Sequence, residues 1–160
     1  MKILTEKEAD PTLLEGKRLV VAGYGNQGRA QAQNLRDSGY GVTIAARPDG
    51  NGWKAALEDG FEVSTIPEAC RAADLLLFLL PDEVQGEVFD REVSGNLRPG
   101  SAICFAHGFS VAFGSVNSDA YDILLVAPKG QGRRLRRAYL EGTGIPVAAV
   151  STGFPAGLSP

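Results

Sequence analysis

A glycine-rich hexapeptide directly after a short apolar run constrains this chain more than any other feature. The run covers residues 19–22, and the hexapeptide is Gly23-Tyr24-Gly25-Asn26-Gln27-Gly28. A helix-like stretch then continues to Ser38. In this setting the first glycine permits a tight strand-to-helix turn, the second lets the backbone approach a pyrophosphate, and the third lets the helix pack on the strand. The hexapeptide therefore predicts a dinucleotide-binding turn, the competing interpretation being a simple chain reversal.

Short apolar segments alternate with helix-like segments along the whole chain. This alternation predicts a parallel sheet with right-handed crossovers, and residues 75–80 are apolar on both strand faces, as in a central strand covered from both sides. We predict a single Rossmann-like, doubly wound α/β domain with a mainly parallel sheet over residues 1–150, followed by an irregular tail at residues 151–160. The predicted strands are residues 17–22, 41–46, 61–63, 74–80, 101–105, 123–127 and 147–150.

Two helix starts carry a pair of residues suited to capping. Thr65 is followed three positions later by Glu68, and Asp82 is followed at the same spacing by Gln85. The first residue of such a pair accepts a backbone N–H, and the second reaches back to the first. We therefore predict a capped helix start at Thr65 and another at Asp82.

Composition excludes several classes of partner. The 160 residues carry a formal charge of −3, which argues against a nucleic-acid surface. No stretch approaches the roughly 20 apolar residues of a membrane span, and residues 1–7 contain no apolar signal core. We expect a cytoplasmic protein that acts on a small molecule, without a nucleic-acid or membrane partner. Cys70 and Cys104 are interpreted as buried, reduced thiols.

The end of the second predicted strand bears on the choice of cofactor. NAD sites place an acidic residue about 20 positions beyond the glycines, whereas an arginine there suits the 2′-phosphate of NADP. Arg47 stands at this position, followed by a polar loop at residues 48–53 that could wrap the adenosine phosphate. NADPH is favoured over NADH, although Asp49 would repel a phosphate if it pointed inward. The alternative is that Arg47 is a solvated surface charge.

Two further segments lie at the carboxyl ends of predicted strands, where open α/β sheets bind their ligands. His107, the only histidine in the chain, could position or protonate a substrate oxygen. Lys129, between Pro128 and Gly130, could direct an ammonium group at a carboxylate or phosphate. The competing interpretations are a structural histidine and a surface lysine. A cluster of arginines follows on a predicted helix: Arg133, Arg134, Arg136 and Arg137. We interpret it as a solvated helix face, the alternative being a binding surface for an acidic partner.

Six segments in order resemble the amino-terminal domain of ketol-acid reductoisomerase. They are residues 23–28, 34–39, 73–74, 81–85, 105–109 and 126–130. That family binds NADPH in this domain and converts acetohydroxy acids to dihydroxy acids by a magnesium-assisted alkyl shift followed by hydride reduction. The resemblance implies that His107 and Lys129 are catalytic residues of the cleft. It also implies a set of cofactor-binding residues: Gly23, Tyr24, Gly25, Asn26, Gln27, Gly28, Arg47, Asn51, Leu80, Pro81, Asp82 and Gln85.

The chain also departs from the family it resembles. Family members continue into a helical domain whose acidic side chains hold two magnesium ions, and this sequence stops where that domain would begin, so we expect no complete magnesium site in it. Histidines common in the family are replaced by Arg29, Ala112 and Arg133, and serines of the phosphate loop by Gly50 and Gly52. These departures favour a stand-alone relative that is not a complete isomeroreductase.

Three functions remain open at this point. The first is an NADPH-dependent reductase of a carbonyl or imine in specialised biosynthesis, with His107 or Lys129 orienting the acceptor. The second is a non-redox enzyme, such as a cyclase or isomerase, that has kept the fold. The third is a cofactor-binding half-enzyme that needs a separate helical partner. In each case the side of the cleft that the helical domain covers in the family would expose apolar surface here, and a homodimer could bury that surface.

Overall fold

The computed structural model describes residues 9–114, 116 and 120–152. The strands are β1 (Leu19–Ala22), β2 (Val42–Ala45), β3 (Glu62–Ser64), β4 (Leu75–Phe78), β5 (Ala102–Phe105), β6 (Asp122–Pro128) and β7 (Val147–Thr152). The helices are α1 (Asn26–Asp37), α2 (Asn51–Glu58), α3 (Ile66–Ala72), α4 (Asp82–Val88), α5 (Phe109–Ala112) and α6 (Gly132–Leu140). A 3₁₀ turn at Pro11–Leu14 precedes β1, and a π-helical turn at Phe89–Val93 follows α4.

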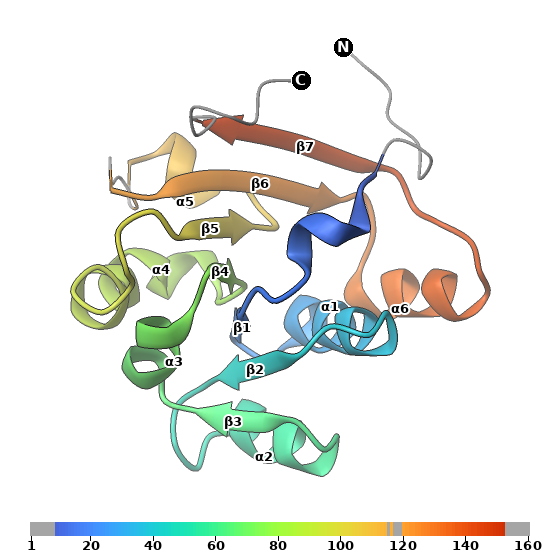
Figure 1. Ribbon diagram of the computed structural model, residues 1–160, viewed down its shortest axis with the longest axis horizontal. Coiled ribbons are helices and arrows are strands. Elements are labelled where there is room, and N and C mark those ends of the chain that lie inside the picture. The colour runs from blue at the N-terminus through green and yellow to red at the C-terminus, as the bar shows by residue number, and fades with distance from the viewer. Residues whose placement is uncertain (1–8, 115, 117–119, 153–160) are drawn as a thin grey trace.

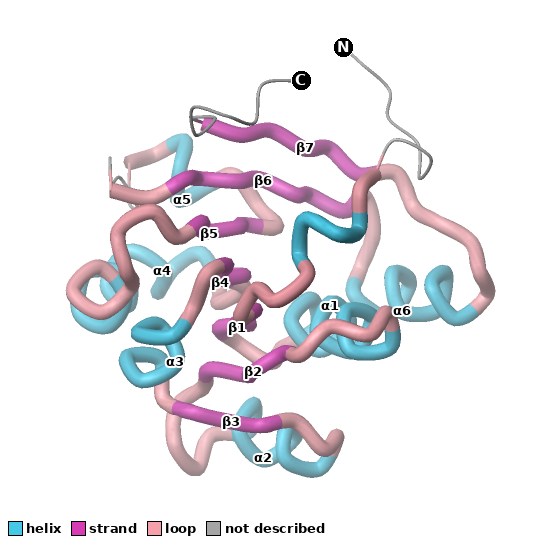
Figure 2. The backbone as a smooth tube through the Cα atoms, viewed as in Figure 1, coloured by secondary structure: helices cyan, strands magenta, loops and turns pink. Residues whose placement is uncertain are grey.

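One seven-stranded sheet organises the chain, in the order β3-β2-β1-β4-β5-β6-β7. All neighbouring strands are parallel except β6 and β7, which are antiparallel. Helices α1, α2 and α6 cover one face and α3, α4 and α5 the other (Figure 1). The strand layer between the two helix layers is traced in magenta in Figure 2. The predicted doubly wound, mainly parallel α/β fold is confirmed.

All seven predicted strands are present, with ends that differ from the predicted ones by at most two residues, and the carboxyl-terminal strand needs a correction. Strand β7 continues to Thr152, so Ser151 and Thr152 belong to the sheet and not to the predicted irregular tail. Ser151 pairs with Leu124, and Thr152 pairs with Ile123. The antiparallel pairing to β6 extends β7, because the facing strand offers backbone partners there. The rest of the predicted tail, residues 153–160, lies outside the described residues.

Strand β4 separates two apolar cores, as its sequence predicts. Leu76 and Phe78 pack into a core with residues of α3, whereas Leu77 faces a second core with residues of α1 and α2. Successive side chains of a strand point to opposite faces, so an apolar run serves both cores at once. The apolar character of β4 on both faces therefore reflects its place in the middle of the sheet.

The two cysteines lie in these cores as free thiols. Burial raises the pKa of the Cys70 thiol to about 12 and that of the Cys104 thiol to about 11. Both groups therefore stay protonated at neutral pH, which agrees with their interpretation as buried, reduced thiols.

The two predicted helix caps have different outcomes. The Glu68 carboxylate accepts hydrogen bonds from the Thr65 N–H at 3.3 Å and from Thr65 Oγ1 at 2.6 Å, as predicted. The prediction for Asp82 and Gln85 is wrong, because α4 begins at Asp82 itself and Pro81 occupies the cap position. The Asp82 carboxylate contacts His107 instead. Gln85 Nε2 donates to the Leu80 carbonyl at 2.7 Å.

Asp74 joins the amino-terminal ends of the two central strands. Its carboxylate accepts the backbone N–H of Arg18 at 2.8 Å, and the guanidinium groups of Arg18 and Arg98 also contact it. The backbone hydrogen bond and these cations lower the pKa of Asp74 to about 2. The ionised carboxylate thus stabilises the folded chain.

We expect Asp74→Asn to lower the free energy of unfolding by about 1–2 kcal/mol at neutral pH, a value reduced to allow for solvent screening of the partly exposed group. A folded-state pKa below the unfolded one contributes stability above about pH 4, and that contribution is lost as the pH falls toward about 2. Urea unfolding across this range should show the two proteins converging. Asp90→Asn, at an exposed carboxylate, is the control. A difference that persists unchanged below about pH 2 would contradict the assignment.

Candidate dinucleotide-binding site

The three glycines of the turn after β1 have distinct surroundings. Gly23 has φ +95°, a conformation that favours glycine, and a Cβ there would lie 2.9 Å from the Leu79 carbonyl oxygen. A Cβ on Gly28 would lie 1.9 Å from the Gly23 carbonyl oxygen. Gly25, by contrast, has no heavy atom within 4 Å of its Cβ position. The first and third glycines therefore close the turn, whereas the second borders open space.

Open space at Gly25 coincides with the amino terminus of α1. Gly25 is the cap residue of this helix and no side chain caps it, so its first-turn N–H groups are available to a ligand. The positive end of the helix dipole favours an anion at the same place. The turn also lies between β1 and β4, where the chain order reverses and open α/β sheets bind ligands. These residues fit a pyrophosphate.

Tyr24 is buried within the turn and connects α1 to α2. Its hydroxyl donates to Asp59 Oδ2 at 2.7 Å, and the same carboxylate accepts Arg29 Nε at 2.7 Å and Gln33 Nε2 at 3.0 Å. Burial and the Asp59 carboxylate raise the pKa of Tyr24 above its usual range, while hydrogen bonding to Arg29 lowers the pKa of Asp59. The Tyr24 side chain is thus committed to helix packing. Sequence reasoning missed Asp59, because no local motif marks it.

Gln27 connects the glycine turn to the segment that carries Lys129. Its Nε2 donates to the Gly130 carbonyl at 3.0 Å. Nearby, a Cβ on Gly132 would lie 1.8 Å from the Asn26 carbonyl oxygen, so α6 begins in close contact with the start of α1. Lys129 is exposed beside these contacts, and its N–H donates to the Pro146 carbonyl at 2.9 Å. Gly132 was not singled out from the sequence, because no local motif marks its contact with Asn26.

The segment after β4 adjoins the glycine turn and reaches His107. The Leu79 N–H donates to the Ala22 carbonyl at 2.9 Å, which brings the ends of β4 and β1 together. Asp82 Oδ2 lies 2.7 Å from His107 Nδ1. Gln85 is buried, and its Oε1 has no hydrogen-bond partner within the part of the chain that the structure describes. Leu80, Pro81, Asp82 and Gln85 are therefore grouped with His107 beside the glycine turn.

Arg47 is exposed at the carboxyl end of β2, the strand next to β1. Its carbonyl accepts the Gly50 N–H at 3.1 Å, and Asp49 has φ +60° within this turn. Helix α2 begins at Asn51, so the predicted loop over residues 48–53 is too long by three residues. Half-buried Trp53 packs into the core on this side, which accounts for the earlier helix start. Arg47 and Asn51 nevertheless lie at the predicted edge of the sheet.

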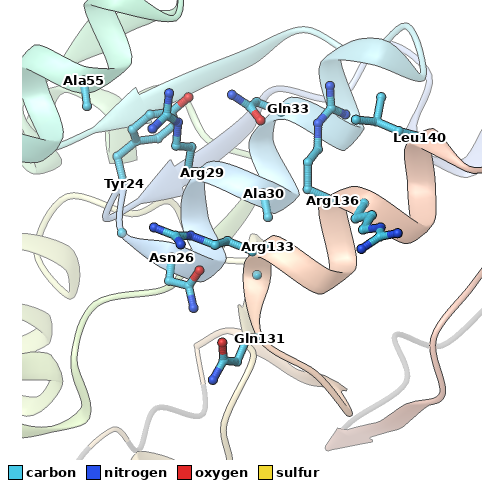
Figure 3. A pocket seen from close by; sticks show the side chains of 13 residues that line it. Tyr24, Asn26, Arg29, Ala30, Gln33, Ala55, Gln131, Arg133, Arg136 and Leu140 are labelled. Carbon is cyan, nitrogen blue, oxygen red and sulfur yellow. The ribbon is translucent and has the colours of Figure 1, made fainter.

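A groove of about 750 Å³ runs between α1 and α6 (Figure 3). Arginines line it, but most are already paired within the protein: Arg29 with Asp59, Arg136 with Asp37, and Arg137 with Glu141 at 2.7 Å. The groove shares Tyr24, Gly25 and Asn26 with the predicted site and does not include His107 or Lys129. Arg133, Arg134 and Arg137 are exposed, which agrees with their interpretation as a solvated face, whereas Arg136 is half-buried and binds Asn34 and Asp37 of α1.

Across residues 9–114, 116 and 120–152, no three His, Cys, Asp or Glu side chains gather in a way that could hold a metal ion. None of the described helices has the length and apolar character needed to cross a membrane.

The doubly wound sheet and the glycine turn at its switch point define a dinucleotide-binding domain of the Rossmann class. Residues 13–153 match the NADPH-binding domain of acetohydroxy acid isomeroreductase. The chain belongs to this family, the ketol-acid reductoisomerases, through that domain. The resemblance inferred from the six sequence segments is confirmed.

One solved structure supports the same assignment, and another shares the fold. An NADH-preferring ketol-acid reductoisomerase from an uncultured archean matches with a TM-score of 0.93 and 39% identity, over 98% of this chain and 49% of that one. A semialdehyde dehydrogenase NAD-binding protein from Cupriavidus necator matches with a TM-score of 0.72 and 18% identity, over 87% of this chain and 54% of that one. The second match shows the fold alone. This chain spans about half the length of both structures.

Proposed function

We propose that this domain binds NADPH and takes part in the reduction of a carbonyl or imine in biosynthesis. The observation that carries the proposal is the meeting of two elements at one sheet edge: the glycine turn, with open space at Gly25, and the segment that holds Asp82 against His107. A pyrophosphate bound at Gly25 would place the rest of the dinucleotide along the carboxyl ends of the strands. Membership of the family supports the same cofactor.

The proposed cofactor contacts follow from where each residue lies. The backbone of Gly23–Gly28 would hold the pyrophosphate, and Arg47 with Asn51 would bind the adenosine end. Leu80, Pro81 and Gln85 would border the nicotinamide half, where the buried Gln85 Oε1 offers an acceptor without a partner in the described chain. When bound, the reduced nicotinamide supplies a hydride.

His107 and Lys129 are proposed to act on the substrate. A protonated imidazole can donate to the substrate oxygen or nitrogen as negative charge develops there. The Lys129 ammonium can attract and orient an anionic substrate, because it is exposed beside the glycine turn. Both side chains stand at the ends of neighbouring strands, β5 and β6.

The test follows NADPH absorbance and product together, with the purified chain and a panel of 2-keto acids, ketones and cyclic imines. Turnover of any panel member that yields the reduced product would support the proposal. A separate arm offers 2-acetolactate with magnesium. Isomeroreduction needs a Lewis acid to polarise the substrate, so we expect no dihydroxy acid from these 160 residues alone. Tight NADPH binding with no reduction of any panel member would contradict the reductase proposal.

A second candidate is a cofactor-binding half of a larger enzyme. Exposed apolar side chains favour it: Phe113 is 74% exposed beside Phe109, and Val126, Val147 and Val150 are exposed on β6 and β7. The register of β6 with β7 puts Val126 and Val147 on one face of the sheet and Val150 on the other. Exposed apolar groups can mark interaction surfaces, so a helical partner or a second copy of this chain could cover those on one of these faces. Light scattering after size-exclusion chromatography would show a dimer, and activity only after addition of a helical domain would favour the half-enzyme.

NADPH is proposed as the preferred cofactor, with Arg47 binding the 2′-phosphate. Arg47→Ala should weaken NADPH binding about tenfold or more and NADH binding far less, because a charge-assisted hydrogen bond contributes about 1.5–3 kcal/mol. Calorimetric titration with each cofactor measures this difference. Lys54→Ala, which removes an exposed cation of α2, is the control.

The Asp49 carboxylate would repel the 2′-phosphate if it pointed inward, and the similar ketol-acid reductoisomerase structure is that of an NADH-preferring enzyme. A preference for NADH is therefore the alternative outcome. Equal losses for both cofactors in Arg47→Ala would show that Arg47 does not read the 2′ position. Tighter binding of NADH than of NADPH by the unmodified chain would overturn the proposed preference.

A further inference from the structure

We propose that Asp82 is a positioning residue, which fixes the protonation pattern of the His107 ring, and not a direct cofactor ligand. The carboxylate holds the proton on Nδ1 and thereby leaves Nε2 for the substrate. This inference rests on the proposed reductase function, in which His107 acts as the proton donor. It replaces the cofactor contact that the family resemblance implies for Asp82.

Strand order brings the pair together across 25 residues of sequence. Asp82 is the first residue of α4, which follows β4, and His107 follows the end of β5 by two residues. Strands β4 and β5 are parallel neighbours, with Leu77 opposite Cys104. The carboxyl ends of both strands therefore meet at one edge, where Asp82 Oδ2 lies 2.7 Å from His107 Nδ1.

Neither side chain has a competing partner in the described chain. The Asp82 carboxylate does not cap α4, and its contact with His107 is its only hydrogen bond or ion pair among the described residues. The imidazole is likewise bound only through Nδ1 there, and its side chain is 71% exposed while that of Asp82 is 31% exposed. Asp82 therefore holds Nδ1 of the ring, and Nε2 remains available to solvent or a ligand.

The chemistry of the two groups determines the direction of the hydrogen bond. An ionised carboxylate can only accept, so the nitrogen that faces it must carry a proton. A neutral His107 therefore presents an unprotonated Nε2, and a charged His107 presents an Nε2–H while the carboxylate stabilises the imidazolium. The same relation between a carboxylate and a histidine orients the imidazole in serine proteases.

This arrangement suits proton donation during the reduction of a carbonyl group. With a reduced nicotinamide bound, the substrate carbon would receive a hydride from it, the carbon–oxygen π bond would break, and the electron pair of that bond would take the Nε2 proton of His107. The substrate would become an alcohol, with the two electrons supplied by oxidation of the cofactor. His107 returns to the neutral ring with a proton still on Nδ1, where it is hydrogen-bonded to Asp82, and water restores the Nε2 proton.

A direct test uses the fact that the chain contains one histidine. In ¹⁵N-labelled protein at about pH 9, where imidazoles are neutral, the two ring nitrogens report the tautomer without interference from other residues. The unmodified chain should show a protonated Nδ1. Asp82→Ala should give the tautomer mixture of a free imidazole, and Asp82→Asn should shift the population toward Nε2–H, because an amide can donate to Nδ1.

Glu83→Gln is the matched control, since it removes a neighbouring exposed carboxylate from the same helical turn. It should leave the tautomer unchanged. A free-imidazole mixture in the unmodified chain, or an equal effect of Glu83→Gln and Asp82→Asn, would overturn the positioning role whatever the enzyme reduces.

Activity measurements separate this role from the proposed function. With a substrate that the chain reduces, Asp82→Asn should lower kcat about 100-fold and leave the KM for NADPH within about twofold, since general acid catalysis contributes about 10²–10⁴-fold. A loss of NADPH affinity with kcat unchanged would instead make Asp82 a cofactor ligand and overturn the inference. A protonated Nδ1 in a chain that reduces nothing would support the positioning role and contradict only the reductase.

Discussion

Replacing Gly25 with valine is expected to abolish NADPH and NADH binding while the fold remains intact. No heavy atom lies within 4 Å of the Gly25 Cβ position, so the protein itself can accept a side chain there. The same space is where the pyrophosphate is proposed to approach the uncapped start of α1. A branched side chain would exclude the phosphate, and we expect at least about a 100-fold loss of affinity, or roughly 3 kcal/mol.

Titration followed by the fluorescence of Trp53, the only tryptophan, measures this affinity, and calorimetry provides an independent value. Thermal unfolding of the variant should stay close to that of the unmodified chain. Gly41→Val is the matched control, because Gly41 also borders open space but precedes β2 at the other end of the strand. Undiminished NADPH binding by Gly25→Val would remove the glycine turn from the proposed site.

The smaller substitution Gly28→Ala should damage the protein more than Gly25→Val. A Cβ on Gly28 would lie 1.9 Å from the Gly23 carbonyl oxygen and 3.5 Å from a Val21 methyl group. The first overlap is with backbone, so no side-chain rotation can relieve it, and α1 must move away from β1. Overpacking typically lowers the free energy of unfolding by about 1–3 kcal/mol. Because this clash is with fixed backbone, we expect a loss at or above the upper end of that range.

Urea unfolding and the yield of soluble protein measure this loss. Gly25→Ala serves as the control within the same turn, since its added methyl group meets open space. We expect Gly25→Ala to unfold at nearly the same urea concentration as the unmodified chain. If Gly28→Ala were equally stable, the packing of α1 against the turn could not be as close as the structure describes.

The turn and the strands were predictable because their signals are local. Apolar runs such as residues 75–80 mark buried strands through side-chain alternation, and alternation with helices indicates a parallel sheet. The spacing of Gly23, Gly25 and Gly28 follows from the steric demands of one turn, which neighbouring residues in the chain determine. For this reason the fold class and the position of the glycine turn could be derived from the sequence.

Contacts between distant segments could be known only from the tertiary structure. Asp82 shows the difference: its local sequence predicts a helix cap with Gln85, whereas the pairing of β4 with β5 places it against His107. Asp59 joins Tyr24 and Arg29 from the end of α2, and Gly132 meets Asn26 from the start of α6. Local sequence specifies backbone conformation, but strand order and helix packing decide which side chains meet, because those contacts depend on the placement of the whole sheet.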